Sequence, residues 1–203
     1  MTERDTRSGI ILVGGKARRM NGDEKYFHTF GGVSFLDIII TALSPVTDEI
    51  LLVARDEIQC GQFSSYPDLR VVSDIQKEQG PIGGLHAGLL ETTSELAFVV
   101  ACDMPCIQPT VVELLFQAAE GFDAVVPLHE NGHIEPLHAV YRTAPALNYL
   151  EQPHSRRMKV LADTLNTRMM PMCELRTADP DLKSFTNINH PEDLEQLRRD
   201  GGC

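Results

Sequence analysis

The sequence predicts an α/β protein of three layers, in which a mainly parallel sheet lies between two layers of helices. Two observations lead to this fold class. Short, continuous apolar runs alternate with segments of helical pattern through most of the 203 residues, and such runs are typical of parallel strands buried on both faces. Glycine or aspartate follows several of these runs, at the carboxyl ends of strands where such sheets bind ligands.

The predicted elements follow one another along a single domain. We expect that domain to cover residues 1–203, with flexible ends at about 1–7 and 200–203. Strand and helix patterns alternate, with strands expected at 8–13, 49–54, 70–74, 95–103 and 123–128 and helices at 35–46, 84–93 and 109–121.

The last third of the chain departs from this alternation. Asn131–Gly132 is a strong hairpin signal between two strand-like halves of segment 122–142. Segment 145–171 is predicted to be helical with an irregular exit. Residues 191–200 are predicted to form a short helix, with Pro191 at its first position.

Composition limits the classes of function. The net charge of -11 makes a general nucleic-acid-binding surface improbable, because such surfaces are rich in Lys and Arg. No apolar run approaches the roughly 20 residues that span a bilayer, and the first residues lack the apolar core of a signal peptide. The five cysteines form no C-x-x-C, which favours reduced thiols and a cytoplasmic location.

A glycine loop with a group of cations is the first candidate site. Gly14–Gly15 follow the apolar run Ile10–Val13 and let backbone N–H groups approach a ligand closely. The loop matches neither the P-loop nor the G-x-G-x-x-G pattern. An anion site and an ordinary basic surface turn are both compatible with the cations that follow, which are Lys16, Arg18, Arg19 and Lys25.

Two further loops carry candidate residues at strand ends. Asp74 ends one strand, and Gly80–Gly84 then open a helix, where Gly83 and Gly84 would let the backbone approach a flat ligand or simply form a turn. Asp103 follows the run Phe98–Ala101, and its carboxylate could serve as a hard oxygen ligand for Mg²⁺. Aspartate at a strand end is also a common helix cap or turn residue.

Four other features carry candidate residues. His129–His133 match H-E-x-x-H formally, but Pro127 and Asn131–Gly132 favour a hairpin over the helix that a zinc protease needs. Glu135 and His138 lie on the returning strand, where both would line a pocket, although Glu135–Pro136 would equally suit a sheet edge. The basic segment 154–159 is a solvated helix face or a site for a second anionic substrate. Cys102 and Cys106 flank Asp103 and are interpreted as buried structural cysteines.

Together these loops resemble a known family, the molybdenum cofactor nucleotidyltransferases, and within it the guanylyltransferases. The similarity covers nearly the whole chain, with the motifs in the family's order. The matching segments are Leu12–Gly15 with Arg18–Met20 and Lys25, Gly80–Gly84, Cys102–Pro105, Glu135–Tyr141 and Phe185–Leu194.

The resemblance implies a Rossmann-like nucleotidyltransferase sheet and transfer of GMP from GTP to the terminal phosphate of molybdopterin, with release of pyrophosphate. It implies Mg²⁺, with Mn²⁺ as a substitute, on Asp103 aided by Asn187 or Asn189. Arg19 and Lys25 would stabilise phosphate charge, with Asp103 as the third catalytic residue. Arg156 and Arg157 are candidates for the second substrate. The nucleotide contacts implied are Leu12, Val13, Gly14, Gly15, Lys25, Asp74, Gly80, Gly83, Gly84 and Asp103.

The resemblance also suggests partners and leaves alternatives open. Cofactor-insertion machinery or molybdoenzyme apoproteins would receive the product, with no nucleic acid or membrane involved. The alternatives are a CTP-dependent molybdopterin or sugar-phosphate nucleotidyltransferase, a catalytically idle nucleotide- or cofactor-binding protein, and a zinc hydrolase.

Overall fold

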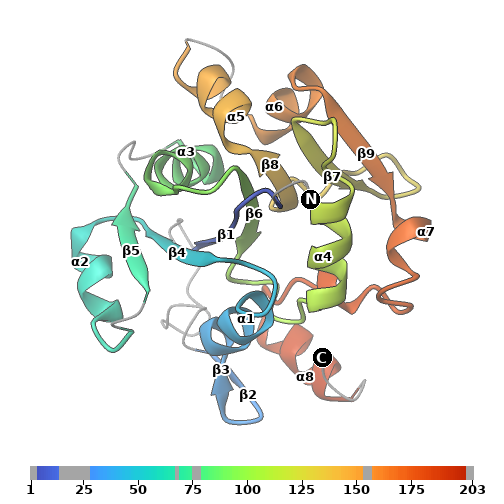
Figure 1. The fold of residues 1–203 in the computed structure, drawn as a ribbon. Coiled ribbons are helices and arrows are strands. Elements are labelled where there is room, and N and C mark those ends of the chain that lie inside the picture. Colours follow the sequence, from blue (N-terminus) through green and yellow to red (C-terminus); the bar gives the residue numbers. More distant parts are fainter. Residues whose placement is uncertain (1–3, 14–27, 67–68, 75–78, 153–156, 200–203) are drawn as a thin grey trace.

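The structure is a computed structural model, and it describes residues 4–13, 28–66, 69–74, 79–152 and 157–199 (Figure 1). The strands are β1 (Arg7–Leu12), β2 (Thr29–Phe30), β3 (Val33–Ser34), β4 (Glu49–Ala54), β5 (Arg70–Ser73), β6 (Leu96–Ala101), β7 (Ala124–Leu128), β8 (His138–Arg142) and β9 (Thr167–Pro171). The α-helices are α1 (Phe35–Leu43), α2 (Glu57–Cys60), α3 (Pro81–Glu91), α4 (Pro109–Gln117), α5 (Thr143–Leu150), α6 (Met158–Thr164), α7 (Met172–Leu175) and α8 (Pro191–Arg199). The 3₁₀ turns among the described residues are η2 (Gly61–Phe63) and η3 (Lys183–Phe185).

A seven-stranded sheet organises the described residues, in the order β5-β4-β1-β6-β8-β7-β9. Neighbours from β5 to β6 are parallel, β8 is antiparallel to both β6 and β7, and β9 is parallel to β7. The strands β2 and β3 form a separate short hairpin. The prediction of a mainly parallel sheet is therefore confirmed.

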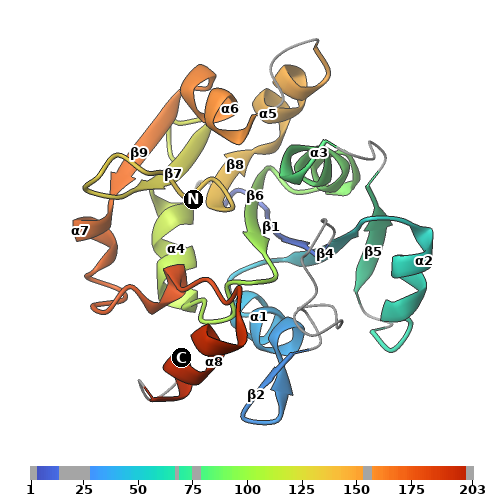
Figure 2. The same ribbon diagram turned by 180° about the vertical axis from the view of Figure 1, so that it is seen from behind.

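Helices cover both faces of this sheet (Figures 1 and 2). Successive residues of β1 point to opposite faces, because side chains alternate along a strand. Ile10 and Leu12 lie in the apolar core shared with α3, α5 and α6, whereas Ile11 and Val13 lie in the core shared with α1 and α4. β1 therefore packs against helices on both faces of the sheet, which gives the three predicted layers.

The predicted hairpin is present and one predicted helix is partly wrong. β7 and β8 pair in antiparallel register, and Gly132 has the positive φ of 83° that the turn between them requires. Within 145–171, however, residues Thr167–Pro171 form strand β9 and not helix. Of its five residues only Met170 is buried, so this edge strand shows no apolar run in the sequence.

The expected flexible segment 1–7 ends at a residue that the structure places in the sheet. Arg7 begins β1 and is buried, because its guanidinium is enclosed by helix α4. Its Nη1 donates to Glu113 Oε2 at 2.5 Å, and its guanidinium carbon lies 4.7 Å from the centre of the Phe116 ring. Residues 1–3 and 200–203 lie outside the described residues.

Two expectations concern the chain's chemistry and environment. Cys60, Cys102 and Cys173 form no disulfide, whereas Cys106 is disulfide-bonded, so the expectation of reduced thiols throughout is wrong at this position. Among the helices that the structure describes, none combines the length and apolar character needed to cross a bilayer.

Candidate active site

The parallel strands β5, β4, β1 and β6 end at one edge of the sheet, and the candidate loops leave from that edge. Hydrogen bonds continue past the strand ends and hold the first residues of these loops. Val13 N donates to Val53 O at 3.0 Å, Asp74 N to Ala54 O at 2.7 Å, and Cys102 N to Leu12 O at 3.1 Å. The sheet therefore brings the starts of three predicted loops together.

The first loop is described only as far as Val13. Leu12 and Val13 are buried at the end of β1. The loop glycines and cations, which are Gly14, Gly15, Lys16, Arg18, Arg19 and Lys25, lie outside the described residues.

Gln59 holds the beginning of this loop, and the sequence patterns did not single it out. Its side chain is fully buried. Its Nε2 donates to Val13 O at 3.3 Å and its Oε1 accepts from Arg55 N at 2.7 Å, which ties the end of β1 to the segment after β4. Asp56 Oδ1 accepts from Gln59 N and caps α2. The sequence does contain a signal for this contact, because Asp56 is an acidic residue suited to a helix N-cap and stands three residues before Gln59.

The glycines of the second loop have different positions. Gly80 has φ 68° and precedes the first residue of α3, so it forms the predicted turn into a helix. Gly83 N donates to Gly80 O at 3.1 Å within the first turn. Gly84 is buried, and a Cβ there would lie 3.3 Å from Leu12 Cδ2. A Cβ at position 84 would therefore press on the Leu12 side chain by a few tenths of an ångström, so close packing is one reason for glycine there.

Asp103 and Asn187 come together at the end of β6. Asp103 lies in the turn after this strand and is half-buried. Its backbone oxygen accepts from Ile188 N at 2.8 Å, which fixes the segment that carries Asn187 beside it. Asn189 is held differently, because its N–H donates to Asp193 Oδ2 at the start of α8.

A cavity of about 450 Å³ opens beside Asp103. It extends from the central strands towards the turn between β7 and β8, away from β4 and β5. Asn189 does not line it. Its lining includes Pro81, Asp103, His133, Glu135, Lys159 and Asn187.

The H-E-x-x-H match lies in the hairpin turn, as predicted. His129 N donates to His133 O at 2.8 Å and Gly132 N to His129 O at 2.9 Å, so this segment is not helical. In the part of the chain that the structure describes, no group of three His, Cys, Asp or Glu side chains could hold a metal ion. The geometry therefore lacks the arrangement that a zinc hydrolase needs.

Instead, both histidines turn towards Glu135. His129 Nε2 lies 2.9 Å from Glu135 Oε1, and His133 Nε2 lies 3.5 Å from the same oxygen. The carboxylate is 15% exposed and lines the cavity. Glu135 thus lines a pocket, which is one of the two positions predicted for it.

His138 does not line this cavity. It is fully buried at the start of β8, with its ring edge-on to Phe98 at 5.0 Å and 4.6 Å from the Phe185 ring centre. Burial lowers the pKa of His138 from 6.5 to about 3, against the opposing charge of Asp179. The histidine is neutral and belongs to the core, so its predicted role in a pocket is wrong.

The second basic cluster is described only in part. Arg156 lies outside the described residues, and Arg157 is exposed immediately before α6. Lys159 lines the cavity, and its ammonium also lies 3.5 Å from Asp163 Oδ2. Among the described cations of this cluster, Lys159 is therefore the one that lines the cavity. It belongs to the predicted basic segment 154–159, within which Arg156 and Arg157 were named as the contacts.

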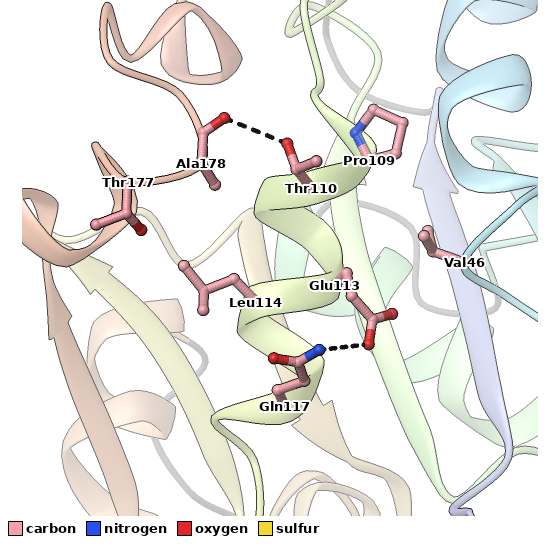
Figure 3. A pocket seen from close by; sticks show the side chains of 8 residues that line it. All are labelled: Val46, Pro109, Thr110, Glu113, Leu114, Gln117, Thr177 and Ala178. Carbon is pink, nitrogen blue, oxygen red and sulfur yellow. Dashed lines mark hydrogen bonds between the residues drawn. The ribbon is translucent and has the colours of Figure 1, made fainter.

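A separate hollow of about 370 Å³ lies against α4 (Figure 3). None of the candidate site residues lines it. Two hydrogen bonds tie its polar groups together, from Thr110 Oγ1 to Ala178 O at 3.3 Å and from Gln117 Nε2 to Glu113 Oε1 at 2.9 Å. The candidate site is therefore the cavity beside Asp103.

Comparison with known proteins identifies relatives over nearly the whole chain. The MobA-like NTP transferase domain matches residues 9–168. A probable molybdenum cofactor guanylyltransferase of Methanosarcina mazei is 38% identical over an alignment of 205 residues, gaps included. The alignment covers 96% of this chain and 91% of that protein. The molybdenum cofactor guanylyltransferase of Desulfosudis oleivorans is 34% identical over 196 residues, which cover 95% and 94% of the two chains.

A solved structure agrees with these relatives. Molybdopterin-guanine dinucleotide biosynthesis protein A from Archaeoglobus fulgidus is 33% identical and superimposes with a TM-score of 0.82. The match covers 96% of this chain and 98% of that one, so it includes both the strand edge and the cavity.

Proposed function

Because this chain belongs to the MobA-like NTP transferase family, we propose that it transfers GMP from GTP to the terminal phosphate of molybdopterin or the molybdenum cofactor. An oxygen of that phosphate attacks the α-phosphorus of GTP and forms the new P–O bond. The bond between the α-phosphorus and its bridging oxygen breaks, and pyrophosphate leaves with the electron pair. The attacking group is already an anion, so no general base is needed.

One observation carries this assignment beyond the family name. Asp103 stands between the strand ends that begin the nucleotide loops and a cavity large enough for a second substrate. A transferase needs two ligands that meet at one reacting group, since catalysis by alignment depends on their relative placement. The strand edge and the cavity supply two such places on either side of Asp103.

The oxygen ligands fit a hard divalent cation. Asp103 supplies one carboxylate and Asn187 an amide oxygen on the same cavity, and Mg²⁺ typically takes one or two carboxylates with phosphate and water completing its shell. Mg²⁺, or Mn²⁺ in its place, would neutralise phosphate charge there. Asn189 remains a further candidate ligand, from the same segment.

The remaining roles belong to residues of a single nucleotidyltransferase domain. Arg19 and Lys25 stabilise charge on the transferring phosphate and on pyrophosphate. Arg156 and Arg157 contact the second substrate. The nucleoside is held by Leu12, Val13, Gly14, Gly15, Asp74, Gly80, Gly83 and Gly84.

Calorimetry tests the nucleotide half of this proposal. We expect the wild-type protein to bind GTP with Mg²⁺ in preference to CTP, ATP and UTP. The change Asp103→Ala should weaken Mg²⁺-dependent binding, whereas Glu120→Ala, which alters an exposed carboxylate outside the site, should not. Preference for CTP would reassign the substrate, and no nucleotide binding would reject the proposal.

Pyrophosphate release tests the chemistry. With GTP, Mg²⁺ and molybdopterin, the wild-type protein should release pyrophosphate, and Asp103→Ala should lower the rate by about 100-fold or more. A protein that binds GTP and releases none would be a binding protein and not a transferase.

A further inference from the structure

Glu135 presents a carboxylate that is fixed in place before any ligand arrives. Its backbone N–H donates to Pro127 O at 3.0 Å, and its backbone oxygen accepts from His138 N at 3.1 Å. Its Oε1 accepts from His129 Nε2 at 2.9 Å. Backbone and side chain are therefore both held, which is the condition for a precise polar contact in a binding site.

The second oxygen of this carboxylate accepts no hydrogen bond from the residues that the structure describes. An ionised carboxylate can accept about four hydrogen bonds. The side chain lines the cavity beside Asp103, where the apolar side chains of Ile134, Leu137 and Met158 supply surfaces for a flat ring. A fixed carboxylate edge next to apolar walls suits a heterocycle that carries two adjacent N–H donors.

We infer that Glu135 recognises the 2-amino-4-oxopyrimidine edge of the pterin ring in the acceptor substrate. This inference rests on the proposed function and adds the group that selects the acceptor. The ring N–H and the 2-amino group of a pterin are two donors side by side, and they match the two oxygens of one carboxylate. His129 is a positioning residue, because it acts by orienting Glu135.

Guanine carries the same pair of donors, so the position of Glu135 decides between the two rings. The nucleotide loops begin at β1 and β5, whereas Glu135 lies on the turn before β8, on the opposite side of β6. Asp103 is at the end of β6, between them. The acceptor's pterin therefore faces Glu135, and the guanine of GTP does not.

Two small ring compounds test this assignment on the intact protein. Pterin has the 2-amino group, and lumazine has an oxygen in its place, which would face the carboxylate acceptor to acceptor. We expect wild-type protein to bind pterin at least about 10-fold more tightly than lumazine in fluorescence titrations, since a site built to pair with donors rejects an analogue that lacks one. Equal affinities, or binding of neither compound, would overturn the inference without any variant.

The change Glu135→Gln gives the sharper result. A glutamine offers one acceptor and one donor, which pair with the ring N–H and the 2-oxygen of lumazine. The preference should therefore reverse towards lumazine, an outcome that a merely structural role would not produce. The matched control is Glu130→Gln, an exposed glutamate of the same turn, which should keep the wild-type preference.

GTP binding separates this inference from the proposed function. The variant Glu135→Gln should bind GTP with unchanged affinity if the pterin is its ligand. Weaker GTP binding in this variant, with binding of the 2-amino-free ITP unchanged, would move the contact to guanine and overturn the inference. Wild-type protein that binds GTP but does not distinguish pterin from lumazine would retain the proposed function and reject the role of Glu135.

Discussion

His138 places a titratable ring where water cannot reach it. The ring packs between Phe98 and Phe185, and among the described residues neither of its nitrogens has a hydrogen-bond partner. Protonation would bury a charge whose nearest opposing group is the carboxylate of Asp179. The folded protein therefore keeps this ring neutral until the pH is far below the ordinary pKa of histidine.

The free energy of unfolding should fall as the pH is lowered from about 6.5 towards 3. In that interval the unfolded chain binds a proton at His138 and the folded protein does not, because burial lowers the folded pKa to about 3. The contribution of this one group is at most about 1.4 kcal/mol per pH unit. Urea unfolding at several pH values measures it.

The change His138→Leu should flatten this dependence by one proton and should not lower the free energy of unfolding at pH 7, because it removes two unpaired nitrogens. His190→Gln, at an exposed position, is the control and should leave the slope unchanged. An identical slope in His138→Leu would show that the acid sensitivity has another source.

Single residues also show what the sequence could predict of the site. Asp103 and Asn187 were expected together, and the structure joins them, since both belong to short motifs that follow predicted elements. The sequence did not predict the contact of Gln59 with Val13 or that of Glu135 with His129. Each depends on side-chain direction across two loops, which spacing along the chain does not specify.

Helix α3 is held against the sheet by glycines. A Cβ at Gly88 would lie 3.2 Å from Val53 Cγ2, which is a tight contact, and 2.6 Å from Ile10 Cγ2, which is closer than packed atoms approach. Ile10 is a β-branched side chain in the buried strand β1, so it has little freedom to move away. The spacing of α3 from the sheet sets where Gly80 and Pro81 stand at the site.

The change Gly88→Ala should lower the free energy of unfolding by about 1–3 kcal/mol, which is typical of overpacking in a core. Gly61→Ala is the matched control. Gly61 has a helical φ of −60° and nothing lies within 4 Å of a Cβ there, so its effect should stay within about 0.5 kcal/mol. Chemical denaturation compares the two. Equal effects would mean that α3 can shift without loss.

Among whole elements, buried strands were easier to predict than edge strands. β6 is a continuous apolar run, and β1 and β4 end in such runs, because both of their faces are covered. Among the described strands, β9 pairs with β7 alone, and it ends at Pro171, so its sequence resembles the end of a helix. Its strand conformation depends on pairing with a segment about 40 residues earlier, and the local pattern of apolar residues does not indicate that pairing.

The two apolar cores on either side of the sheet share their strands, which ties the described parts of the molecule together. β1 and β6 contribute to both cores, and β8 continues from β6 into the part of the sheet that contains β7 and β9. Neither core can lose its strands without exposing the other. We therefore expect the chain to unfold as a single cooperative unit.

Ligand binding should stabilise that whole unit. At a GTP concentration of about 100 times its dissociation constant, with Mg²⁺, mass action adds about 2.7 kcal/mol, which raises the melting temperature of a protein of this size by roughly 5–10 °C. Scanning calorimetry should show one transition that moves as a whole, and Asp103→Ala should move much less at the same concentration. Two transitions, of which GTP shifts only one, would contradict a single domain. In one cooperative unit, the free energy of GTP binding stabilises all strands that the two cores share.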